Sequence, residues 1–474
     1  MTQTPGALSL PRLCVSSLSG GGGKTLLALG LTRALVHKGI SVKPFKKGPD
    51  YIDAAWLEMA AQKSVSNLDP YFLSQARLRS LFAHAARAID QNTLGLIEGN
   101  RGLYDGSDVS GSCSTAVLAR ALDCPVLLSV NCAKMTRTVA ALVQGMTNFE
   151  PGLNFCGVVL NQVGSQRHTR ILRQALEEYT DMPVLGALPC LSGNPLPERH
   201  MGIASQSLTN ETAEQALETL AVFVREHMDV NAALAAARSA PPLPEPEPFW
   251  PAKAENMRSR VRIGYVRDAA LWFYYQENLE ALDRAGAELI RLSLLDAAPW
   301  PEIDGLYLGG GFPEDSARVL SASPRVAELA RLADNGLAIY AECGGFMLLS
   351  KGIQDGAAFW PMSGVFPVTV RLCNKPQGLG YVDGIIVAKN PYFPVGLTLR
   401  GHEFHYSRCE WENQPPEYAM TLSRGTGMGE HSGKDSSMAD GLTRQRVWAS
   451  YTHIFAPALP CWAKNFVNAA RTRP

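Results

Sequence analysis

The chain has 474 residues, of which 46% are hydrophobic and 19% are charged, and its formal net charge at pH 7 is zero. This length exceeds that of one ordinary hydrophobic core, so the composition predicts a globular protein of two domains. The balanced charge indicates no basic surface for nucleic acid or an anionic membrane, and no apolar run is long enough to span a bilayer. We therefore expect neither nucleic acid nor a membrane as a partner.

The cysteines and the first residues indicate the compartment. Ten cysteines are scattered without a CxxC pair, and MTQTPGALSLPRL lacks the charged and apolar regions of a secretory signal. Unpaired cysteines suit a reducing environment, so a cytoplasmic protein is predicted.

Short apolar runs alternate with helical patterns in the first half of the chain. The runs predict strands, and the patterns between them predict helices at 24–38 and 114–122. Alternation of this kind is typical of βαβ units, which build a doubly wound, mainly parallel sheet with helices on both faces. The predicted strands are residues 13–16, 41–45, 94–98, 126–130 and 157–161.

The run LCVSSLSGGGGKTLLALGL breaks an apolar strand with glycines and resumes as a helical pattern at Lys24. The N–H groups at a helix N-terminus bind anions, so this arrangement predicts a P-loop rather than a flexible glycine turn. Lys24 would reach the β- and γ-phosphates of ATP, and the Thr25 hydroxyl would bind Mg²⁺. Leu18 stands where the usual pattern has its first glycine, so the loop is a variant. The predicted nucleotide contacts are Gly20, Gly21, Gly22, Gly23, Lys24 and Thr25.

Acidic residues follow two of the predicted strands. LGLIEGNRGLYDG carries Glu98 and Asp105, and FKKGPDYIDAAW carries Lys46, Asp50 and Asp53. Singly they could be solvated loop charges, but the carboxyl ends of parallel strands meet at one edge, beside the P-loop. Carboxylate and hydroxyl oxygens are the ligands that Mg²⁺ prefers. The predicted metal ligands are Thr25, Asp50 and Glu98.

The segment SAPPLPEPEPFWPAK is rich in proline, acidic and without periodicity. Such composition is typical of a stiff, extended linker. We expect a linker at 239–258 between a first domain of residues 1–238 and a second of residues 259–474.

After this linker the alternation returns. VRIGYV, ELIRL, GLYLGGG and LAIYAEC predict strands, and FYYQENLEALDRAG predicts a helix. The second domain is therefore expected to be α/β as well.

A second candidate centre lies in GLAIYAECGGFMLLS, where an apolar strand meets Cys343 and a helix-like segment. A lone cysteine in such a run is more often a core residue. A sharp strand-to-helix turn, however, exposes a nucleophile at a helix N-terminus, where we expect a lowered thiol pKa. LYLGGGFPE offers glycine N–H groups for an oxyanion hole, and VWASYTHIFA offers His453 as a base. The predicted oxyanion donors are Gly310, Gly311 and Gly344.

With these motifs the chain resembles the cobyrinate a,c-diamide synthase family over nearly its whole length. The motifs are FKKGPDYIDAAW, IEGNRGLYDG, GVVLNQVGSQRH, LPERHMGI, AECGGFMLL, GHEFHYS and SYTHIF. LPERHMGI and GHEFHYS weigh most, because a generic P-loop ATPase needs neither. The family joins a dethiobiotin-synthetase-like ATP domain to a class I glutamine amidotransferase domain.

The resemblance implies an ATP-dependent ligase of cobalamin biosynthesis. ATP would phosphorylate the c- and then the a-acetate carboxylate of cobyrinate, because an amine cannot expel oxide from a free carboxylate. Ammonia released from L-glutamine by Cys343 and His453 would then displace phosphate from the acyl phosphate. The implied cofactor is Mg²⁺, the substrates are ATP, L-glutamine and cobyrinate or a related corrinoid, and a homodimer is left open.

The resemblance also implies roles for single residues. Lys46 would neutralise phosphoryl charge and Asn161 would read adenine, both as ATP contacts. Asp53 and Glu98 would act with Cys343 and His453 as catalytic residues. The implied substrate contacts are Asp50, Tyr51, Asp105, Arg199, His200, His402 and His405.

One departure concerns the amidotransferase triad. Phe455 stands where the usual His-x-Glu pattern has its glutamate, so a Cys343–His453 dyad with weaker glutaminase activity is expected. Elsewhere, Arg101 replaces an apolar residue and could bear on substrate choice.

Three alternatives remain open. The same chemistry could act on hydrogenobyrinate or a nickel sirohydrochlorin, or the protein could be a ligase that depends on free ammonia. In another class, it could be an ATP switch like the ParA and MinD proteins, which need no Cys–His half.

Overall fold

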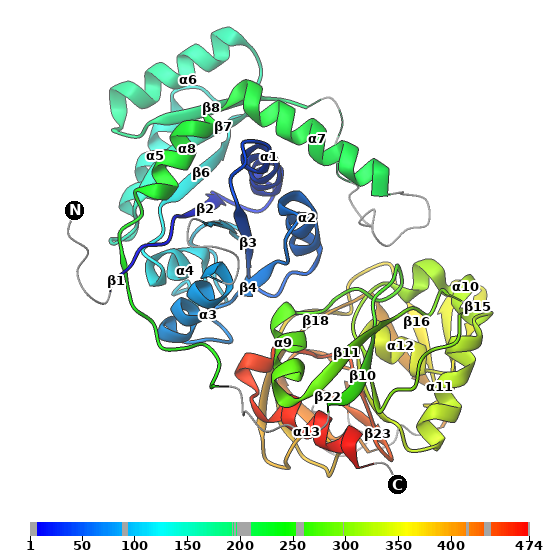
Figure 1. Ribbon diagram of the computed structural model, residues 1–474. Coiled ribbons are helices and arrows are strands. Elements are labelled where there is room, and N and C mark those ends of the chain that lie inside the picture. Colours follow the sequence, from blue (N-terminus) through cyan, green and yellow to red (C-terminus); the bar gives the residue numbers. More distant parts are fainter. Residues whose placement is uncertain are drawn as a thin grey trace. The chain divides into compact units, whose positions relative to one another are not determined.

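The computed structural model describes residues 7–87, 93–191, 193, 196, 210–252, 260–296, 298–413, 417–430 and 438–472. The chain divides into two compact units, with the boundary between Ala252 and Lys253. Figure 1 shows the elements of the first unit in blue to green and those of the second in green to red.

The first unit is built on a sheet of seven strands whose neighbours all run parallel. In sheet order the strands are β4 (Ser66–Leu68), β3 (Val42–Lys47), β5 (Leu94–Glu98), β2 (Arg12–Ser17), β6 (Val126–Asn131), β7 (Phe155–Val163) and β8 (Val184–Pro189). Because β2 lies between β5 and β6, the winding direction changes there, as in doubly wound folds. The predicted fold of this domain is confirmed.

All five predicted strands exist and end within two residues of the expected positions. The residues of β2, β3 and β5 are buried throughout, which explains their continuous apolar runs. Strand β4 was not predicted, because it is only three residues long and two of them are polar.

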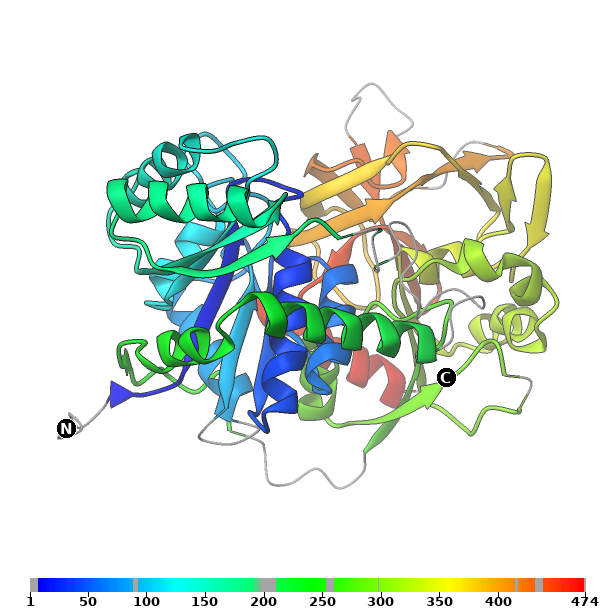
Figure 2. The same cartoon turned by 90° about the horizontal axis from the view of Figure 1, so that it is seen from above.

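Helices connect the strands of this sheet. The P-loop helix α1 packs against α7, and a Cβ atom at Gly30 of α1 would lie 2.7 Å from the carbonyl oxygen of Leu220 in α7. This close approach requires glycine, and Figure 2 shows the green helix α7 crossing in front of the dark blue helix α1. The helices are α1 (Lys24–His37), α2 (Ile52–Ala61), α3 (Gln75–Arg87), α4 (Thr115–Ala121), α5 (Thr138–Asn148), α6 (Gln166–Tyr179), α7 (Asn210–His227) and α8 (Val230–Arg238).

Part of the proline-rich segment packs on the first unit. Its strand β9 (Leu243–Pro244) pairs with β1 (Ala7–Leu8), and Leu243 and Phe249 are buried. The wholly buried guanidinium of Arg12 donates to the carbonyl oxygens of Pro241, at 2.6 Å, and of Leu122, at 2.6 Å. Residues 240–252 therefore pack on the first unit, because the apolar side chains of Leu243 and Phe249 are buried in its core.

The second unit contains a mostly parallel sheet. In sheet order its strands are β11 (Ala287–Leu292), β10 (Val261–Val266), β12 (Gly305–Leu308), β13 (Ala338–Glu342), β24 (Val447–Ser450) and the antiparallel edge strand β23 (Leu442–Arg444). Its helices are α9 (Gln276–Ala285), η1 (Pro313–Ser316), α10 (Ala317–Ser321), α11 (Pro324–Asp334), α12 (Gly344–Leu349), η2 (Ala456–Ala458) and α13 (Cys461–Arg471). The prediction of a second α/β domain is confirmed.

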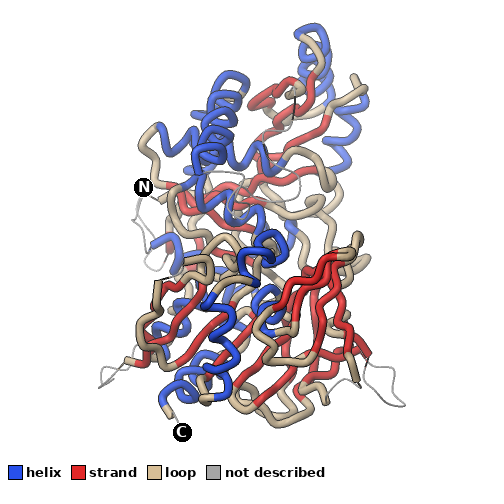
Figure 3. The backbone as a smooth tube through the Cα atoms, turned by 90° about the vertical axis from the view of Figure 1, so that its right-hand side faces the viewer, coloured by secondary structure: helices blue, strands red, loops and turns tan. Residues whose placement is uncertain are grey.

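Two further sheets complete this unit, and Figure 3 draws their strands, like all others, as red tubes. An antiparallel sheet has the order β21 (Gly429–Glu430), β22 (Met438–Asp440), β20 (Met420–Arg424), β17 (Gly378–Ile386), β18 (Thr398–His405) and β25 (His453–Ile454). A mixed sheet has the order β15 (Ala358–Pro361), β14 (Gly352–Asp355), β16 (Val368–Leu372) and β19 (Ser407–Trp411). Among the helices of the described ranges, none has the length and apolar character needed to cross a membrane.

Replacing Arg12 by methionine should destabilise the first unit. The variant keeps the bulk of the side chain but leaves buried carbonyl oxygens without their donor, at a cost of about 3 kcal/mol. This corresponds to a melting temperature roughly 6 to 12 °C lower for the unit, measured by calorimetry. The control Arg87→Met breaks an exposed pair with Glu245 on the same segment, worth less than about 1 kcal/mol. Equal shifts in the two variants would contradict the prediction.

Candidate active sites

The glycine-rich loop between β2 and α1 is held by two neighbouring strands. The carbonyl oxygen of Gly22 accepts hydrogen bonds from Ser129 Oγ of β6, at 2.8 Å, and from Asn161 Nδ2 of β7, at 3.4 Å. Gly23 begins the helix with φ of 84°, and a Cβ atom there would collide with the Asn161 amide. Asn161 therefore supports the loop backbone, and its contact with adenine stays a prediction.

Lys24 folds back over this loop. Its Nζ donates to Ser17 Oγ at 3.0 Å and to the carbonyl oxygen of Ser19 at 3.3 Å. Burial lowers the pKa of Lys24, although Glu98 opposes this shift. A lysine and helix N–H groups that converge on one loop form an anion site of the kind that binds phosphates.

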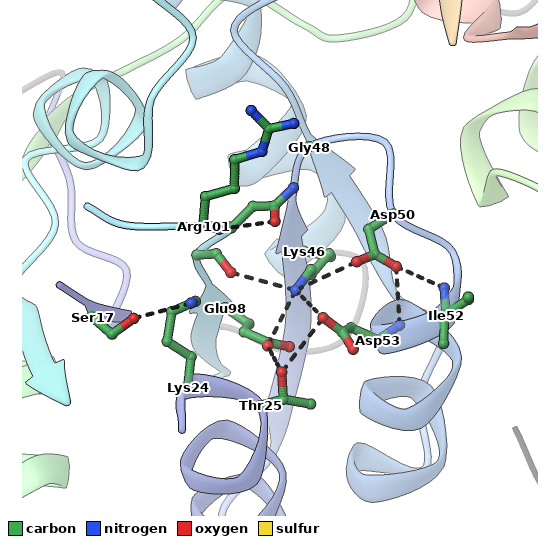
Figure 4. Close-up of polar contacts among 12 residues, drawn as sticks. Ser17, Lys24, Thr25, Lys46, Gly48, Asp50, Ile52, Asp53, Glu98 and Arg101 are labelled. Carbon is green, nitrogen blue, oxygen red and sulfur yellow. Dashed lines mark hydrogen bonds and ion pairs between the residues drawn. The ribbon is translucent and has the colours of Figure 1, made fainter. Parts of the chain in front are cut away.

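The carboxylates expected at this edge of the sheet do converge there, around Lys46 (Figure 4). Lys46 Nζ lies 2.6 Å from Asp53 Oδ2, 3.1 Å from Glu98 Oε1 and 3.9 Å from Asp50 Oδ2. Strand pairing sets Lys46 opposite Glu98, whose Oε1 accepts the Thr25 hydroxyl at 2.6 Å. One ammonium group is thus shared by three carboxylates.

Burial governs ionisation in this cluster. Desolvation raises the pKa of Glu98 to about 7, and desolvation together with the charge of Asp53 raises that of Asp50 to about 6. Burial also opposes the ionisation of Asp53, but Lys46 keeps the pKa of that carboxyl below its ordinary value. For Lys46 itself burial is outweighed by Asp53, Glu98 and Asp50, which raise its pKa. The ammonium of Lys46 is therefore a fixed positive charge.

The same residues fit a magnesium ion. Glu98 Oε2 is buried and forms no hydrogen bond with any residue that the structure describes. Beside it lies the Thr25 hydroxyl, a second oxygen donor of the kind that Mg²⁺ prefers. Within the described ranges no three His, Cys, Asp or Glu residues are grouped as a complete metal site.

Other predicted residues lie around this cluster. Asp50 Oδ1 accepts the backbone N–H groups of Ile52, at 2.8 Å, and Asp53, at 3.1 Å, and so caps α2. Tyr51 is buried just before that helix. Asp105 is exposed and accepts the N–H group of Gly102 at 2.8 Å. Arg199 and His200 lie outside the described residues.

The sequence did not reveal Asn67 of β4. This buried side chain donates to the carbonyl oxygens of Gly48, at 2.8 Å, and Asp50, at 3.1 Å. It fixes the loop that carries Asp50 and leads into helix α2, which carries Asp53. A lone asparagine in a three-residue strand has no sequence signal.

In the second unit, Cys343 occupies a strained turn between β13 and α12. Its φ of 47° and ψ of −105° are rare for a residue other than glycine, and its N–H group donates to Ser450 O at 2.7 Å. Burial raises the pKa of the thiol, and the charge of Glu314 adds to this. The expectation of a lowered pKa is wrong, because desolvation outweighs the dipole of a helix of only six residues. The thiol needs a base to accept its proton.

His453 and the glycine loop meet at this turn. A Cβ atom at Gly310 would collide with His453 Cε1, and one at Gly344 would lie 2.9 Å from the Gly311 nitrogen. The Gly310 N–H group already donates to Phe273 O at 3.3 Å, whereas no bond of the Gly311 N–H group is found in the described part of the chain. Gly311 is thus better placed than Gly310 as an oxyanion donor, a role that stays a prediction.

His402 and His405 are both buried in the second unit. His402 lies opposite His453 in the β18–β25 pair and stacks on it, with ring centroids 4.9 Å apart. Burial and the charge of His453 hold the pKa of His402 well below its ordinary value. His405 stacks on Tyr451 at 3.7 Å. The structure brings His402 to the Cys–His centre, and substrate contacts by either residue stay predictions.

Two buried polar residues that the sequence did not indicate hold the segment around His453. Asp440 accepts the N–H groups of Tyr451, at 3.1 Å, and Thr452, at 2.9 Å. Asn278 donates to Ile454 O at 2.9 Å and accepts the N–H group of Ala456 at 2.7 Å. Both sides of His453 are therefore fixed by side chains distant in sequence.

Both units match known families. Residues 13–203 match the CobQ/CobB/MinD/ParA nucleotide binding domain, and residues 262–458 match the CobB/CobQ-like glutamine amidotransferase domain. The chain is 39% identical to the cobyrinate a,c-diamide synthase of Magnetococcus marinus over 98% of both chains. The chain belongs to the cobyrinate a,c-diamide synthase family. It is 36% identical to the member from Methanothermobacter thermautotrophicus, over 94% of this chain and 97% of the relative.

Membership of this family confirms the resemblance found in the motifs. The protein is an enzyme of the ATP- and glutamine-using ligase class, as predicted. An ATP switch of the ParA or MinD kind would have no use for the amidotransferase domain, which is present as a folded unit.

Replacing Glu98 by glutamine should stabilise the protein while abolishing ATP use. The pKa of Glu98 is about 7 in the fold against an ordinary 4.5, so the folded state holds this proton more tightly than the unfolded chain. The wild-type carboxylate therefore costs stability as the pH rises from about 4.5 to 7, and costs most above pH 7. The variant, melted without nucleotide, should exceed the wild type most at pH 8 and less at pH 5. A variant that melts below the wild type at pH 8 would refute this.

Replacing Gly310 by alanine should impair glutamine hydrolysis selectively. The added methyl group collides with the His453 ring, and a displacement of about 1 Å at a reacting group can cost about 100-fold in rate. Glutamate release should fall by that factor, while amidation from ammonium chloride continues. Gly145→Ala, where a Cβ atom meets nothing within 4 Å, serves as the control. Glutamate release within twofold of the wild type would show that His453 is not confined by this loop.

Proposed function

We propose that the protein converts the a- and c-acetate carboxylates of cobyrinate into amides, using ATP and glutamine and passing through acyl phosphates. One observation carries the proposal. The Lys46 cluster beside a P-loop and the Cys343–His453 centre occur in one chain that aligns with cobyrinate a,c-diamide synthases over nearly its full length. The first centre suits the activation of an acid, and the second suits the release of ammonia.

The second unit would release ammonia from glutamine. The thiol of Cys343 gives its proton to His453 and its sulfur attacks the side-chain amide carbon. The N–H groups of Gly311 and Gly344 would stabilise the negative oxygen. The amide nitrogen takes the proton from His453 and leaves as ammonia. Water, deprotonated by His453, then hydrolyses the glutamyl thioester to glutamate.

The first unit would activate the carboxylate. The P-loop N–H groups and Lys24 position the phosphates of ATP, and a substrate carboxylate oxygen attacks the γ-phosphorus while ADP leaves. Lys46, kept charged by its carboxylates, stabilises the phosphoryl oxygens. Mg²⁺, held by Thr25 and Glu98, would supply charge neutralisation on the phosphates. Ammonia then attacks the acyl carbon, and phosphate departs in place of oxide.

The proposal also specifies which tetrapyrrole is the substrate, and the candidates differ in the metal that they carry. Cobyrinate is favoured because the relatives that align over nearly the whole chain carry its name. Hydrogenobyrinate and a nickel sirohydrochlorin would present the same acetate chemistry, so each belongs in the test.

Mass spectrometry of each tetrapyrrole after incubation with protein, ATP, Mg²⁺ and glutamine tests the function. We expect two successive replacements of a hydroxyl by an amino group on cobyrinate, with ADP rather than AMP as the nucleotide product. Cys343→Ala should lose the glutamine-driven reaction and keep the reaction driven by ammonium chloride. Modification of hydrogenobyrinate or nickel sirohydrochlorin alone would replace cobyrinate as the substrate. No change in any of the three, with ATP still hydrolysed, would reject the proposed function.

A further inference from the structure

A buried carboxylate lies against the proposed base of the amidotransferase centre. Glu342 ends β13 directly before Cys343, and its side chain is 1% exposed, as is that of His453. Its Oε2 lies 3.5 Å from His453 Nδ1, which is within ion-pair distance. A charged group is rarely buried so completely without a partner that needs it.

We propose that Glu342 is the positioning residue of His453 and takes the place of the glutamate that the His-x-Glu pattern lacks here. This inference rests on the proposed glutaminase activity of the second unit. A carboxylate that faces Nδ1 holds the ring proton on that nitrogen and leaves Nε2 to accept the proton of Cys343. It also stabilises the imidazolium that forms when the proton arrives. The centre is then a Cys–His–Glu triad in which the acid precedes the nucleophile in sequence.

Two further hydrogen bonds fix the orientation of the Glu342 carboxylate. Oε1 accepts the N–H group of Ile454 at 3.1 Å, and Oε2 accepts the Tyr307 hydroxyl at 3.0 Å. The same carboxylate therefore contacts both the backbone N–H group next to His453 and the Nδ1 atom of its ring. Because Glu342 and Cys343 are consecutive, the same strand end positions the nucleophile and orients the base.

The position two residues after His453 cannot supply this carboxylate. Phe455 is buried there against Tyr275, with ring centroids 5.0 Å apart. Asp440, another buried carboxylate of this unit, bonds to the backbone of Tyr451 and Thr452 and to the Thr452 hydroxyl. Glu342 is thus a described carboxylate with an ion-pair contact to the ring of His453. The distance of 3.5 Å exceeds that of a good hydrogen bond, and contacts of this kind shorten when substrate binds.

The tautomer of His453 tests the proposal directly. Histidine labelled with ¹⁵N distinguishes a ring proton on Nδ1 from one on Nε2, and His453→Asn assigns the signal among the nine histidines. In the wild-type protein, at a pH where the ring is neutral, we expect the proton on Nδ1. A proton on Nε2 would overturn the proposal without the need for any variant at Glu342.

The variant Glu342→Gln separates positioning from structure. Its amide oxygen can still accept the N–H group of Ile454, but the charge beside His453 is gone. We expect loss of the Nδ1–H preference and a fall of kcat for glutamine hydrolysis of about 100-fold or more. KM for glutamine should stay within about twofold, and amidation from ammonium chloride should persist. Glu342→Asp keeps the charge and should recover part of kcat.

The matched control is Asp440→Asn. This variant removes the charge of another buried carboxylate, which accepts hydrogen bonds from the backbone just before His453. If Glu342 were only structural, both variants would lower the melting temperature and leave the tautomer as in the wild type, and the proposal would fall. A wild-type kcat in Glu342→Gln would also overturn it. If the wild-type protein hydrolysed no glutamine, the proposed function would fail instead, while the tautomer would still report whether Glu342 orients His453.

Discussion

The first unit depends on one buried ammonium group that balances three carboxylates. Without Lys46, the charge of the buried Glu98 would be repelled by the charges of Asp50 and Asp53. The parallel sheet makes the cluster possible, since it sets Lys46 and Glu98 on adjacent strands at the edge where the P-loop also begins. One ammonium group cannot neutralise three carboxylates, so the site has too little positive charge. Burial, with a smaller contribution from the charge of Asp53, raises the pKa of Glu98, and a metal ion or a cationic group of a ligand would lower it.

The second unit also relies on buried polar side chains, but there they position the proposed base of a buried thiol. Its nucleophile is a buried thiol whose pKa is raised, so reactivity depends on how well a base is placed rather than on an exposed thiolate. Asp440, Asn278 and Glu342 each use side-chain atoms to bind the backbone around His453. Buried polar groups therefore hold the short strand β25 in place, where a strand of two residues could not hold itself. In the proposed function, a centre that activates carboxylates and a centre that releases ammonia are complementary halves of one amidation.

Much of this arrangement could be predicted from the sequence. The strands of the first sheet have strong apolar runs because both of their faces are buried, and the glycines, Lys24 and Thr25 stand at a fixed spacing after the first of them. Cys343 was selected as a candidate because it follows an apolar strand, and His453 because it follows another apolar run, and their catalytic roles stay predictions. Asn67, Asn278 and Asp440 were not found, because a polar residue that serves a distant backbone group has no pattern of its own. Glu342 could have been noticed, since a glutamate at the end of a wholly apolar strand is unusual.

The sequence by itself determined the strongly periodic strands and helices and the places of the phosphate and thiol motifs, because these follow from local periodicity and spacing. The family was indicated by the resemblance of its motifs. Only the tertiary structure decided how the motifs act. Desolvation reversed the expected direction of the Cys343 pKa, and the burial of Leu243 and Phe249 attached the proline-rich segment to the first unit. Burial and charge pairing depend on residues brought together from distant parts of the chain. The carboxylate beside His453 is the clearest case, since it is in the sequence next to the nucleophile but only the fold brings it to the base.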